Sequence, residues 1–423
     1  MKLHNQFLRG WLRHRSTTLM FAVGSIGAFG IACSAGHEKG GTDDLVPDSA
    51  SADTKDDGGG LQLEGGGLDD IKPEVYLDPE KDNDGDGWLF KEDCDDGNKE
   101  VNPGAYEVAG DGVDNDCDGM VDNPEPDCDT LGIKYDTSSA MDLAKAMGLC
   151  RTTLAGATGK DKRWGVIKAE LLSADGVSKP DPIQWGVLKT FGPNVKPRQG
   201  KNFVLLSSGT ARTPDYPGFI TPLSPSWSAG NSVSPPAGFP KNAIGCTEPF
   251  DKNVNDSANL KLTIRVPTNA HAFLYDLDFY SSEYITFVCT SYNDSFVALL
   301  DSKAPLDPKF NKNISFDSKG NPVSVNNAFF EVCTPGSKGG KSFTCAKGTK
   351  ELEGTGFWDA GRPTENGATS WLQTKAPVIP GETITIQFMV WDTGDHILDS
   401  SVLIDNWRWD AKGTTAPTTD RPK

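Results

Sequence analysis

Two short runs of alternating carboxylates in the N-terminal third of the chain are the residues best placed for chemistry. The first run has aspartates at positions 1, 3 and 5 of a loop, glycine at position 6 and another aspartate at position 12. This spacing is typical of an EF-hand-type calcium loop, in which the backbone carbonyl at position 7 is a further ligand. The candidate metal ligands of the first loop are Asp82, Asp84, Asp86, the carbonyl of Trp88, and Asp93.

A second copy of the pattern follows, with an added acid at position 9 and a glutamate at position 12. Its candidate ligands are Asp114, Asp116, Asp118, the carbonyl of Met120, Asp122 and Glu125. Carboxylates this close repel one another unless a hard cation lies among them, and oxygen ligands suit calcium better than copper. Because Pro103, Pro124 and Pro126 leave no flanking helices, we expect a calcium-binding loop module at 81–128 rather than an EF-hand pair. An acidic, solvated stretch without metal is the alternative.

The nine cysteines indicate an oxidising compartment, because eight remain once Cys33 is set aside. Eight cysteines allow 105 pairings, and the sequence alone does not choose among them. Proximity along the chain favours the pairs Cys94 with Cys117, Cys128 with Cys150, Cys246 with Cys289, and Cys333 with Cys345.

The N-terminus has the features of an export signal. A basic stretch that ends at Arg15 precedes thirteen mostly apolar or small residues, a run too short to span a membrane as a helix. We therefore predict a signal peptide at 1–32. The segment Gly30-Ile31-Ala32-Cys33 resembles the lipobox of bacterial lipoproteins, which implies acylation of Cys33 and a lipid anchor in a membrane. Gly30 departs from that pattern, and ordinary cleavage near Ala35 or a buried N-terminal helix are the alternatives.

The negative charge of the chain is concentrated in one block. The formal net charge is −18, yet residues 34–128 hold 29 acidic and only 6 basic residues. A nucleic-acid partner is excluded, because phosphate binding needs a basic surface. Residues 33–80 are rich in glycine and aspartate and poor in aromatic residues, so we predict a flexible acidic tether there.

The larger part of the chain has the pattern of a β protein. Apolar residues alternate with polar ones at 260–266 and 384–390, and 401–409 is a further apolar run. Ser139 begins a capping box, so one short helix is expected at 140–147. The expected fold is mainly β: a jelly-roll-like antiparallel β-sandwich at 129–410 with one short helix, preceded by the disordered tether and the small loop module, and followed by a disordered tail at 411–423.

The acidic module resembles a known family in three segments. These are Asp93-Cys94-Asp95-Asp96, Asn102-Pro103-Gly104-Ala105-Tyr106-Glu107 and Asp114-Asn115-Asp116-Cys117-Asp118-Gly119. Together they resemble the MopE-type metal-binding motif of bacterial surface proteins, which implies metal binding. The copper association of that family depends on residues without a counterpart here, and Val108 stands where the family often has a cysteine. Calcium is therefore the expected metal and copper the less favoured one.

A second resemblance covers roughly residues 130–410. Its segments include Asp278-Phe279-Tyr280-Ser281-Ser282-Glu283-Tyr284, Tyr292-Asn293-Asp294-Ser295-Phe296, Trp391-Asp392-Thr393-Gly394-Asp395 and Asp399-Ser400-Ser401-Val402-Leu403-Ile404-Asp405-Asn406. They resemble the choice-of-anchor L domain, although Ser282 occupies a position where that family commonly has a second glutamate. The resemblance implies an exported surface protein with no assigned catalytic activity.

The acids of this second resemblance leave two interpretations open. Glu283, Asp294, Asp399 and Asp405 either converge on a second, structural metal site or are buried acceptors that tie strand ends together. The tryptophans likewise fit either a core or a carbohydrate-stacking face, the latter formed from Trp358, Trp371, Trp391, Trp407 and Trp409.

The sequence therefore predicts a non-catalytic lipoprotein of the cell surface or outer membrane, which binds calcium and presents a β-sandwich for binding or adhesion. Its ligand is a surface glycan or protein. The alternative is a secreted hydrolase that acts on glycans with a pair of Asp or Glu residues. The motifs G-x-S-x-G and H-E-x-x-H and a P-loop are absent from the sequence.

Overall fold

A computed structural model describes residues 78–223, 226–246, 252–327, 329–338, 341–362 and 365–422. The signal peptide predicted at 1–32, the acylation site Cys33 and the tether as far as residue 77 lie outside these residues. In this described part of the chain, no helix is long and apolar enough to cross a membrane.

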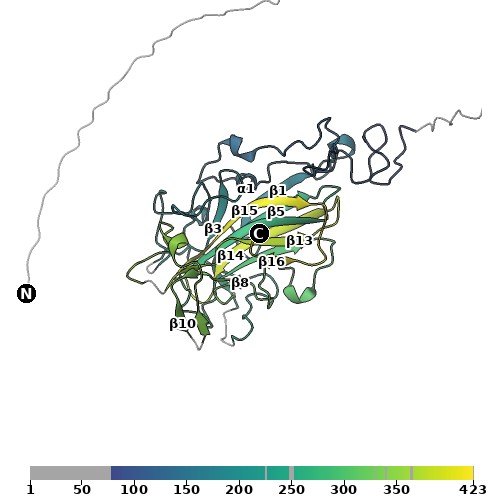
Figure 1. The fold of residues 1–423 in the computed structure, drawn as a ribbon. Helices are drawn as coiled ribbons and strands as arrows, with labels where there is room; N and C mark the ends of the chain where they lie inside the picture. Colours follow the sequence, from purple (N-terminus) through teal and green to yellow (C-terminus); the bar gives the residue numbers. More distant parts are fainter. Residues whose placement is uncertain are drawn as a thin grey trace, which may run out of the picture. The chain divides into compact units, whose positions relative to one another are not determined.

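Six antiparallel strands form the first sheet, in the order β1-β5-β14-β7-β8 with β4 paired to β5 (Figure 1). Their bounds are β1 (Gly165–Leu172), β4 (Ser232–Val233), β5 (Val254–Arg265), β7 (Ser295–Asp301), β8 (Val323–Ser324) and β14 (Thr383–Asp392).

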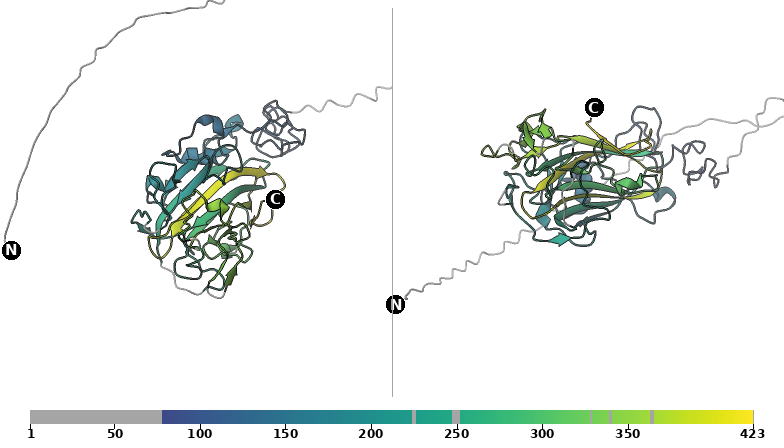
Figure 2. Two further views of the ribbon diagram at one scale, coloured as in Figure 1. Left: turned by 60° about the vertical axis from the view of Figure 1, so that its left-hand side comes forward. Right: turned by 90° about the horizontal axis from the view of Figure 1, so that it is seen from below.

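Eight antiparallel strands form the second sheet, in the order β16-β13-β6-β15-β3-β2, with β12 joining β6 to β9. Their bounds are β2 (Trp185–Leu188), β3 (Phe203–Ser207), β6 (Ala272–Ser281), β9 (Val332–Cys333), β12 (Gly367–Ala368), β13 (Leu372–Pro377), β15 (Ser400–Asp410) and β16 (Thr418–Asp420). A separate hairpin consists of β10 (Gly336–Lys338) and β11 (Lys341–Phe343). The two sheets form the layers of an antiparallel β-sandwich, as we predicted (Figures 1 and 2).

The alternation seen in the sequence places one face of each long strand in the core between the sheets. In β5 and β14, Leu262 pairs with Ile386 and Leu260 with Phe388, and all four side chains are fully buried. From the second sheet, β6 contributes aromatic residues to the same core, among them Tyr275, whose ring lies 5.0 Å from that of Phe388. Burial of these side chains is the main term that stabilises the sandwich.

Loops cover the outer faces of both sheets, which explains why some strands are apolar throughout. On the second sheet, Leu205, Tyr280 and Leu403 pack against Phe191 and Phe357 from outside the sandwich. On the first sheet, a corresponding cluster covers the outer face; it comprises Ala174, Phe239, Val254, Val297, Leu299, Met389 and Trp391. The apolar run predicted at 401–409 is therefore buried on both faces of β15 over most of its length.

The short helix predicted at 140–147 is α1 (Ala140–Ala146), and its N-cap is the expected one. The Ser139 side chain accepts a hydrogen bond from the backbone N–H of Asp142. The helix ends before Gly148, whose positive φ of 102° suits glycine. Single turns of 3-10 helix occur at η1 (Cys128–Leu131), η2 (Gly159–Asp161), η3 (Pro182–Gln184), η4 (Pro308–Phe310) and η5 (Lys350–Leu352).

The prediction of a disordered tail at 411–423 is wrong for its last part. Residues 418–420 form β16, which pairs with β13. Arg421 then donates hydrogen bonds to the backbone carbonyls of Ser370 and Trp371 and forms an ion pair with Glu331. The sequence misses this strand because Thr418 to Asp420 have no apolar side chain, and pairing with a neighbouring strand determines their conformation.

All four disulfides predicted from proximity are present in the structure. They join Cys94 to Cys117, Cys128 to Cys150, Cys246 to Cys289, and Cys333 to Cys345. Four disulfides indicate an extracellular protein, because reducing compartments do not preserve them.

Candidate metal centre

The aspartates of the first loop accept backbone hydrogen bonds that build the loop: Asp82 uses both carboxylate oxygens, whereas Asp84 and Asp86 each use one. Asp82 accepts hydrogen bonds from the backbone N–H groups of Gly85 and Gly87. Asp84 accepts from Asp86 N–H at 3.1 Å, and Asp86 accepts from Trp88 N–H at 2.8 Å. These turns require positive φ at Gly85 and Gly87, which explains the glycines of the motif.

The second oxygen of three aspartates is left buried and without a hydrogen-bond partner in the described part of the chain. These atoms are Oδ2 of Asp84, Asp86 and Asp93. One carboxylate oxygen from each of the same three residues lies within 4.8 Å of the others. Because a buried, unpartnered carboxylate oxygen is strongly destabilising, this group has the character of a cation site. The structure thus brings together three of the ligands predicted for the first loop.

Asp96 is a member of the first cluster that the loop spacing did not include. It forms a group with Asp82 and Asp84, again within 4.8 Å, and it accepts hydrogen bonds from the backbone and the side-chain amide of Asn83. The sequence signal for it is the acidic run at 93–96, because Asp96 follows the last predicted ligand, Asp93, by three residues.

A second cluster contains Glu107, Asp114 and Asp116, with one carboxylate oxygen from each residue within 4.8 Å of the others. Asp114 accepts from the N–H groups of Asp118 and Gly119, as a first loop residue does. Oε2 of Glu107 and Oδ1 of Asp116 are buried and have no partner in the described part of the chain. Glu107 was absent from the predicted ligands, because it precedes the loop and reaches it through a hydrogen bond from Asp116 N–H.

Two predicted ligands of the second loop lie outside this group. Asp118 accepts from Met120 N–H and from the amide of Asn123. The Asp122 carboxylate instead accepts three backbone N–H groups of residues 110–112. The EF-hand spacing predicts more ligands in this loop than the structure brings together. In the described part of the chain, no α-helix directly follows the loop to hold its end in place, and the carboxylates at positions 5 and 9 accept hydrogen bonds from neighbouring turns instead.

Glu125, the last predicted ligand, lies beside the second cluster but is bound to an arginine. Arg151 donates from Nε to Glu125 at 2.8 Å and from Nη2 to Asp116 at 3.0 Å. Burial raises the pKa of Glu125, and the arginine opposes that rise. Arg151 therefore supplies positive charge at one side of the second cluster and leaves the unpartnered oxygens of Glu107 and Asp116 for another cation.

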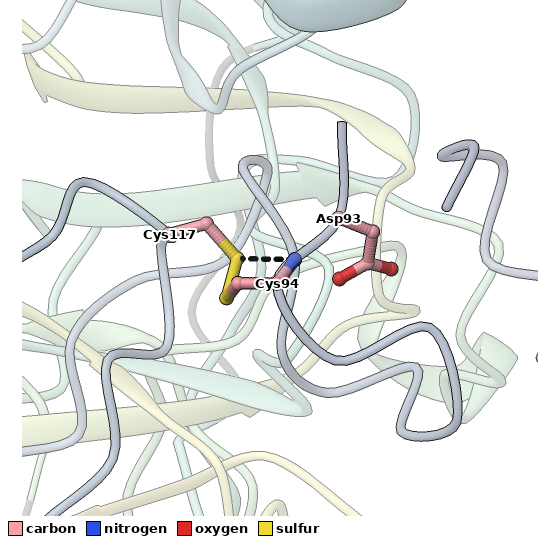
Figure 3. A group of neighbouring side chains, drawn as sticks. All are labelled: Asp93, Cys94 and Cys117. Atoms are coloured by element: carbon pink, nitrogen blue, oxygen red, sulfur yellow. Dashed lines mark hydrogen bonds between the residues drawn. A yellow bond between two sulfur atoms is a disulfide. The ribbon is translucent and has the colours of Figure 1, made fainter. Parts of the chain in front are cut away.

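The sulfur atoms near the first cluster cannot be metal ligands of the thiolate kind. Cys94 and Cys117 lie next to Asp93, but their sulfurs form a disulfide, and Cys94 N–H donates to Cys117 Sγ at 3.2 Å (Figure 3). Copper favours nitrogen and sulfur ligands, whereas both clusters offer carboxylate oxygens. The donor set therefore fits calcium.

Electrostatics in the first cluster also favour a cation. Burial, together with the charge of Asp84, raises the pKa values of Asp86 and Asp93 to about 6. A divalent ion among these oxygens would offset the burial and the repulsion together.

The module is attached to the sandwich by hydrogen bonds between the two. Thr268 donates to Oδ1 of Asn102 at 2.6 Å, and Asn269 exchanges two hydrogen bonds with the backbone of Tyr106. Arg151, which follows Cys150, binds the second cluster directly. The described residues of the module and of the sandwich accordingly belong to one compact unit, while the boundary at residues 128 and 129 stays a prediction.

In the sandwich, three of the four acids that we singled out lie at one end of the two sheets. Asp294 N–H donates to Oε2 of Glu283 at 3.4 Å. Burial, and then the charge of the nearby Asp294, raises the pKa of Asp399. Asp405 does not join them. It lies further along β15, where its carboxylate accepts hydrogen bonds from the backbone N–H groups of Arg198, Gln199 and Asn406. Of the two interpretations, the structure therefore agrees with a buried acceptor at Asp405 and not with a metal ligand shared with the other three acids.

The tryptophans belong to the packing of the fold. Trp391 and Trp407 are buried, and Trp407 stacks on Phe273 with ring centroids 4.3 Å apart. Trp358 and Trp371 pack against the outer cluster of the second sheet, and Trp409 packs against the core. Because Trp391 and Trp407 are buried, these two do not contribute to a stacking face for a sugar.

Two families match parts of the chain. Residues 93–123 match a family described as "Putative metal-binding motif", and residues 201–408 match the choice-of-anchor L domain. Both resemblances proposed from the sequence are thereby confirmed. No match to a curated protein was found. Among solved structures, TmCBM61 in complex with β-1,4-galactotriose aligns with 57% of this chain and 87% of its own, at 12% identity and a TM-score of 0.21.

Proposed function

We propose that this protein is a non-catalytic lipoprotein of the cell surface that binds calcium in its acidic module and presents the sandwich to a surface ligand, a glycan or a protein. The main observation behind this proposal is that five buried carboxylate oxygens in the two clusters have no hydrogen-bond partner in the described part of the chain. Four disulfides and the match to the choice-of-anchor L domain support an exported location. The anchor is the acylated Cys33.

Calcium acts here as a structural switch for the module. Extracellular calcium modules bind with dissociation constants of about 10⁻⁴ to 10⁻³ M. In low calcium the carboxylates of each cluster repel one another, so the loops at 82–96 and 107–118 loosen. In millimolar calcium they close, and the hydrogen bonds that Asn102 accepts from Thr268 and Tyr106 donates to Asn269 hold the module in a defined position on the sandwich.

Calorimetric titration of the oxidised, EDTA-stripped full chain in detergent tests this proposal. Asp86→Asn and Asp116→Asn each keep the side-chain shape but replace an unpartnered oxygen, so each should remove one calcium ion per chain. Asp118→Asn is the matched control, because Asp118 belongs to the same loop but lies outside the cluster. Its calcium affinity should stay within about threefold of the parent.

Two results would contradict the proposal. One is an unchanged number of bound calcium ions in both cluster variants. The other is tighter binding of copper than of calcium by the parent chain.

A further inference from the structure

Four buried acids lie where the strands of both sheets begin or end. Glu283 follows β6 and Asp399 precedes β15 in the second sheet, whereas Asp294 precedes β7 and Asp392 ends β14 in the first. All four are at most 2% exposed.

Strand register brings these acids together. Trp391 of β14 pairs with Ser295 of β7, so Asp392, the last residue of β14, lies beside Asp294, which directly precedes β7. In the second sheet, Ser282 N–H donates to the carbonyl of Asp399, so the backbone that leads into Glu283 lies against Asp399. The hydrogen bond from Asp294 N–H to Glu283 Oε2 links the two sheets at this end.

The carboxylates meet no positive charge in the described part of the chain. Neither oxygen of Asp392 has a hydrogen-bond partner there, and the same holds for Oδ2 of Asp294 and Oδ2 of Asp399. No ion pair to any of the four occurs among the described residues. The nearby imidazole of His396 binds Asp256 instead.

Two hydroxyl groups add neutral oxygen atoms to the group. Oγ1 of Thr393 and Oγ of Ser400 are buried, and each belongs to the residue that follows one of the four acids in sequence. Thr393 Oγ1 has no partner among the described residues, and the Ser400 hydroxyl lies beside the Asp294 carboxylate, where it opposes the rise of that pKa. Carboxylates and hydroxyls together are the ligands that a hard divalent cation prefers.

We propose that Glu283, Asp294, Asp392 and Asp399 bind a calcium ion between the two sheets of the sandwich. The alternative for such a group is protonation: burial raises the pKa of all four acids, to about 7 for Asp294, and mutual repulsion adds to the rise in Glu283, Asp392 and Asp399. A cation would replace these protons and join four strands at one point. This site is separate from the loop module and does not depend on it.

The test starts from a chain that carries both Asp86→Asn and Asp116→Asn, so that the module sites are disabled. Bound calcium is counted by elemental mass spectrometry after dialysis to equilibrium against 1 mM calcium chloride, a concentration in the range of about 10⁻³ M for extracellular sites. We expect one calcium ion per chain, and none after the further change Asp392→Asn.

Asp399→Asn is the second variant, in case the first does not fold. Asp405→Asn is the matched control: it alters a buried acid of β15 outside the group and should keep the ion.

Thermal unfolding distinguishes a lost ligand from a damaged fold. Calcium should raise the unfolding temperature of the starting chain by about 2–4 °C relative to EDTA, and should not do so for Asp392→Asn. In EDTA the Asp392→Asn chain should be at least as stable as its parent, because it lacks one buried carboxylate. A starting chain that holds no calcium and unfolds at the same temperature with and without it would overturn the inference. Because the module variants are measured separately, that outcome leaves the proposed function standing.

Discussion

Asp278 is the residue for which the structure makes the sharpest thermodynamic prediction. It lies in β6, is fully buried, and accepts hydrogen bonds from the Tyr280 hydroxyl at 3.0 Å and the Thr369 hydroxyl at 3.2 Å. Burial, with the nearby charge of Glu351, raises its pKa to about 8, and the hydrogen bonds from Tyr280 and Thr369, with the charge of Arg421, only partly oppose this. We therefore expect Asp278 to be protonated at neutral pH in the folded protein.

The effect on stability follows from proton linkage. In the unfolded chain the pKa of Asp278 is near 3.8, so between pH 4 and pH 8 the folded state binds a proton that the unfolded state does not. Stability therefore falls as pH rises through this window and levels off above pH 8. The slope is at most ~1.4 kcal/mol per pH unit, which amounts to up to ~4 kcal/mol between pH 5 and pH 8.

Asp278→Asn isolates this contribution. Asparagine remains neutral, its carbonyl oxygen accepts from Thr369, and its amide donates to the Tyr280 hydroxyl. Urea unfolding of the oxidised parent and variant in EDTA, at pH 5, 6, 7 and 8, gives the free energy of unfolding of each. The parent should lose up to ~4 kcal/mol relative to the variant over this range. A difference that stays constant within ~0.5 kcal/mol from pH 5 to pH 8 would refute the reasoning.

Two further predictions concern single sites. Gly209→Ala places a methyl group 1.9 Å from Oδ2 of Asp399, so the free energy of unfolding should fall by about 1–3 kcal/mol in urea titrations; an unchanged value would mean that Asp399 moves aside freely. Cys33→Ser should remove an acylated species from the intact mass spectrum of the mature protein and release the protein from the membrane fraction, and identical spectra would reject the lipid anchor.

The parts of this structure that the sequence predicts are those set by local chemistry. The alternation at 260–266 and 384–390 yields β5 and β14, and Ser139 caps the helix that follows it. The disulfide pairs could be predicted because each bridge joins two cysteines that follow one another along the chain, 12 to 43 residues apart. In the first acidic loop, the spacing of aspartates and glycine predicts Asp84, Asp86 and Asp93 as ligands, and the structure places these three carboxylates in one group.

The parts that escape the sequence depend on contacts between distant segments. Asp392 reaches Asp294 only through the register of β14 and β7, which no local pattern contains. Glu107 joins the second cluster because a turn carries it back to Asp116. Asp405 looks equivalent to Asp399 in sequence, yet backbone donors at residues 198 and 199 hold it elsewhere.

The disulfides of the module also determine how the chain carries mechanical load. Cys94–Cys117 spans 23 residues and Cys128–Cys150 spans 22, so a pull applied at residue 78 passes through the sulfur bridges and does not stretch either loop. At ~3.5 Å per extended residue, roughly 160 Å of chain stays out of reach of the force. The second cluster lies inside the first of these loops and is shielded, whereas residues 82–93 lie on the loaded path. Tension on the chain would therefore distort the first cluster before the second.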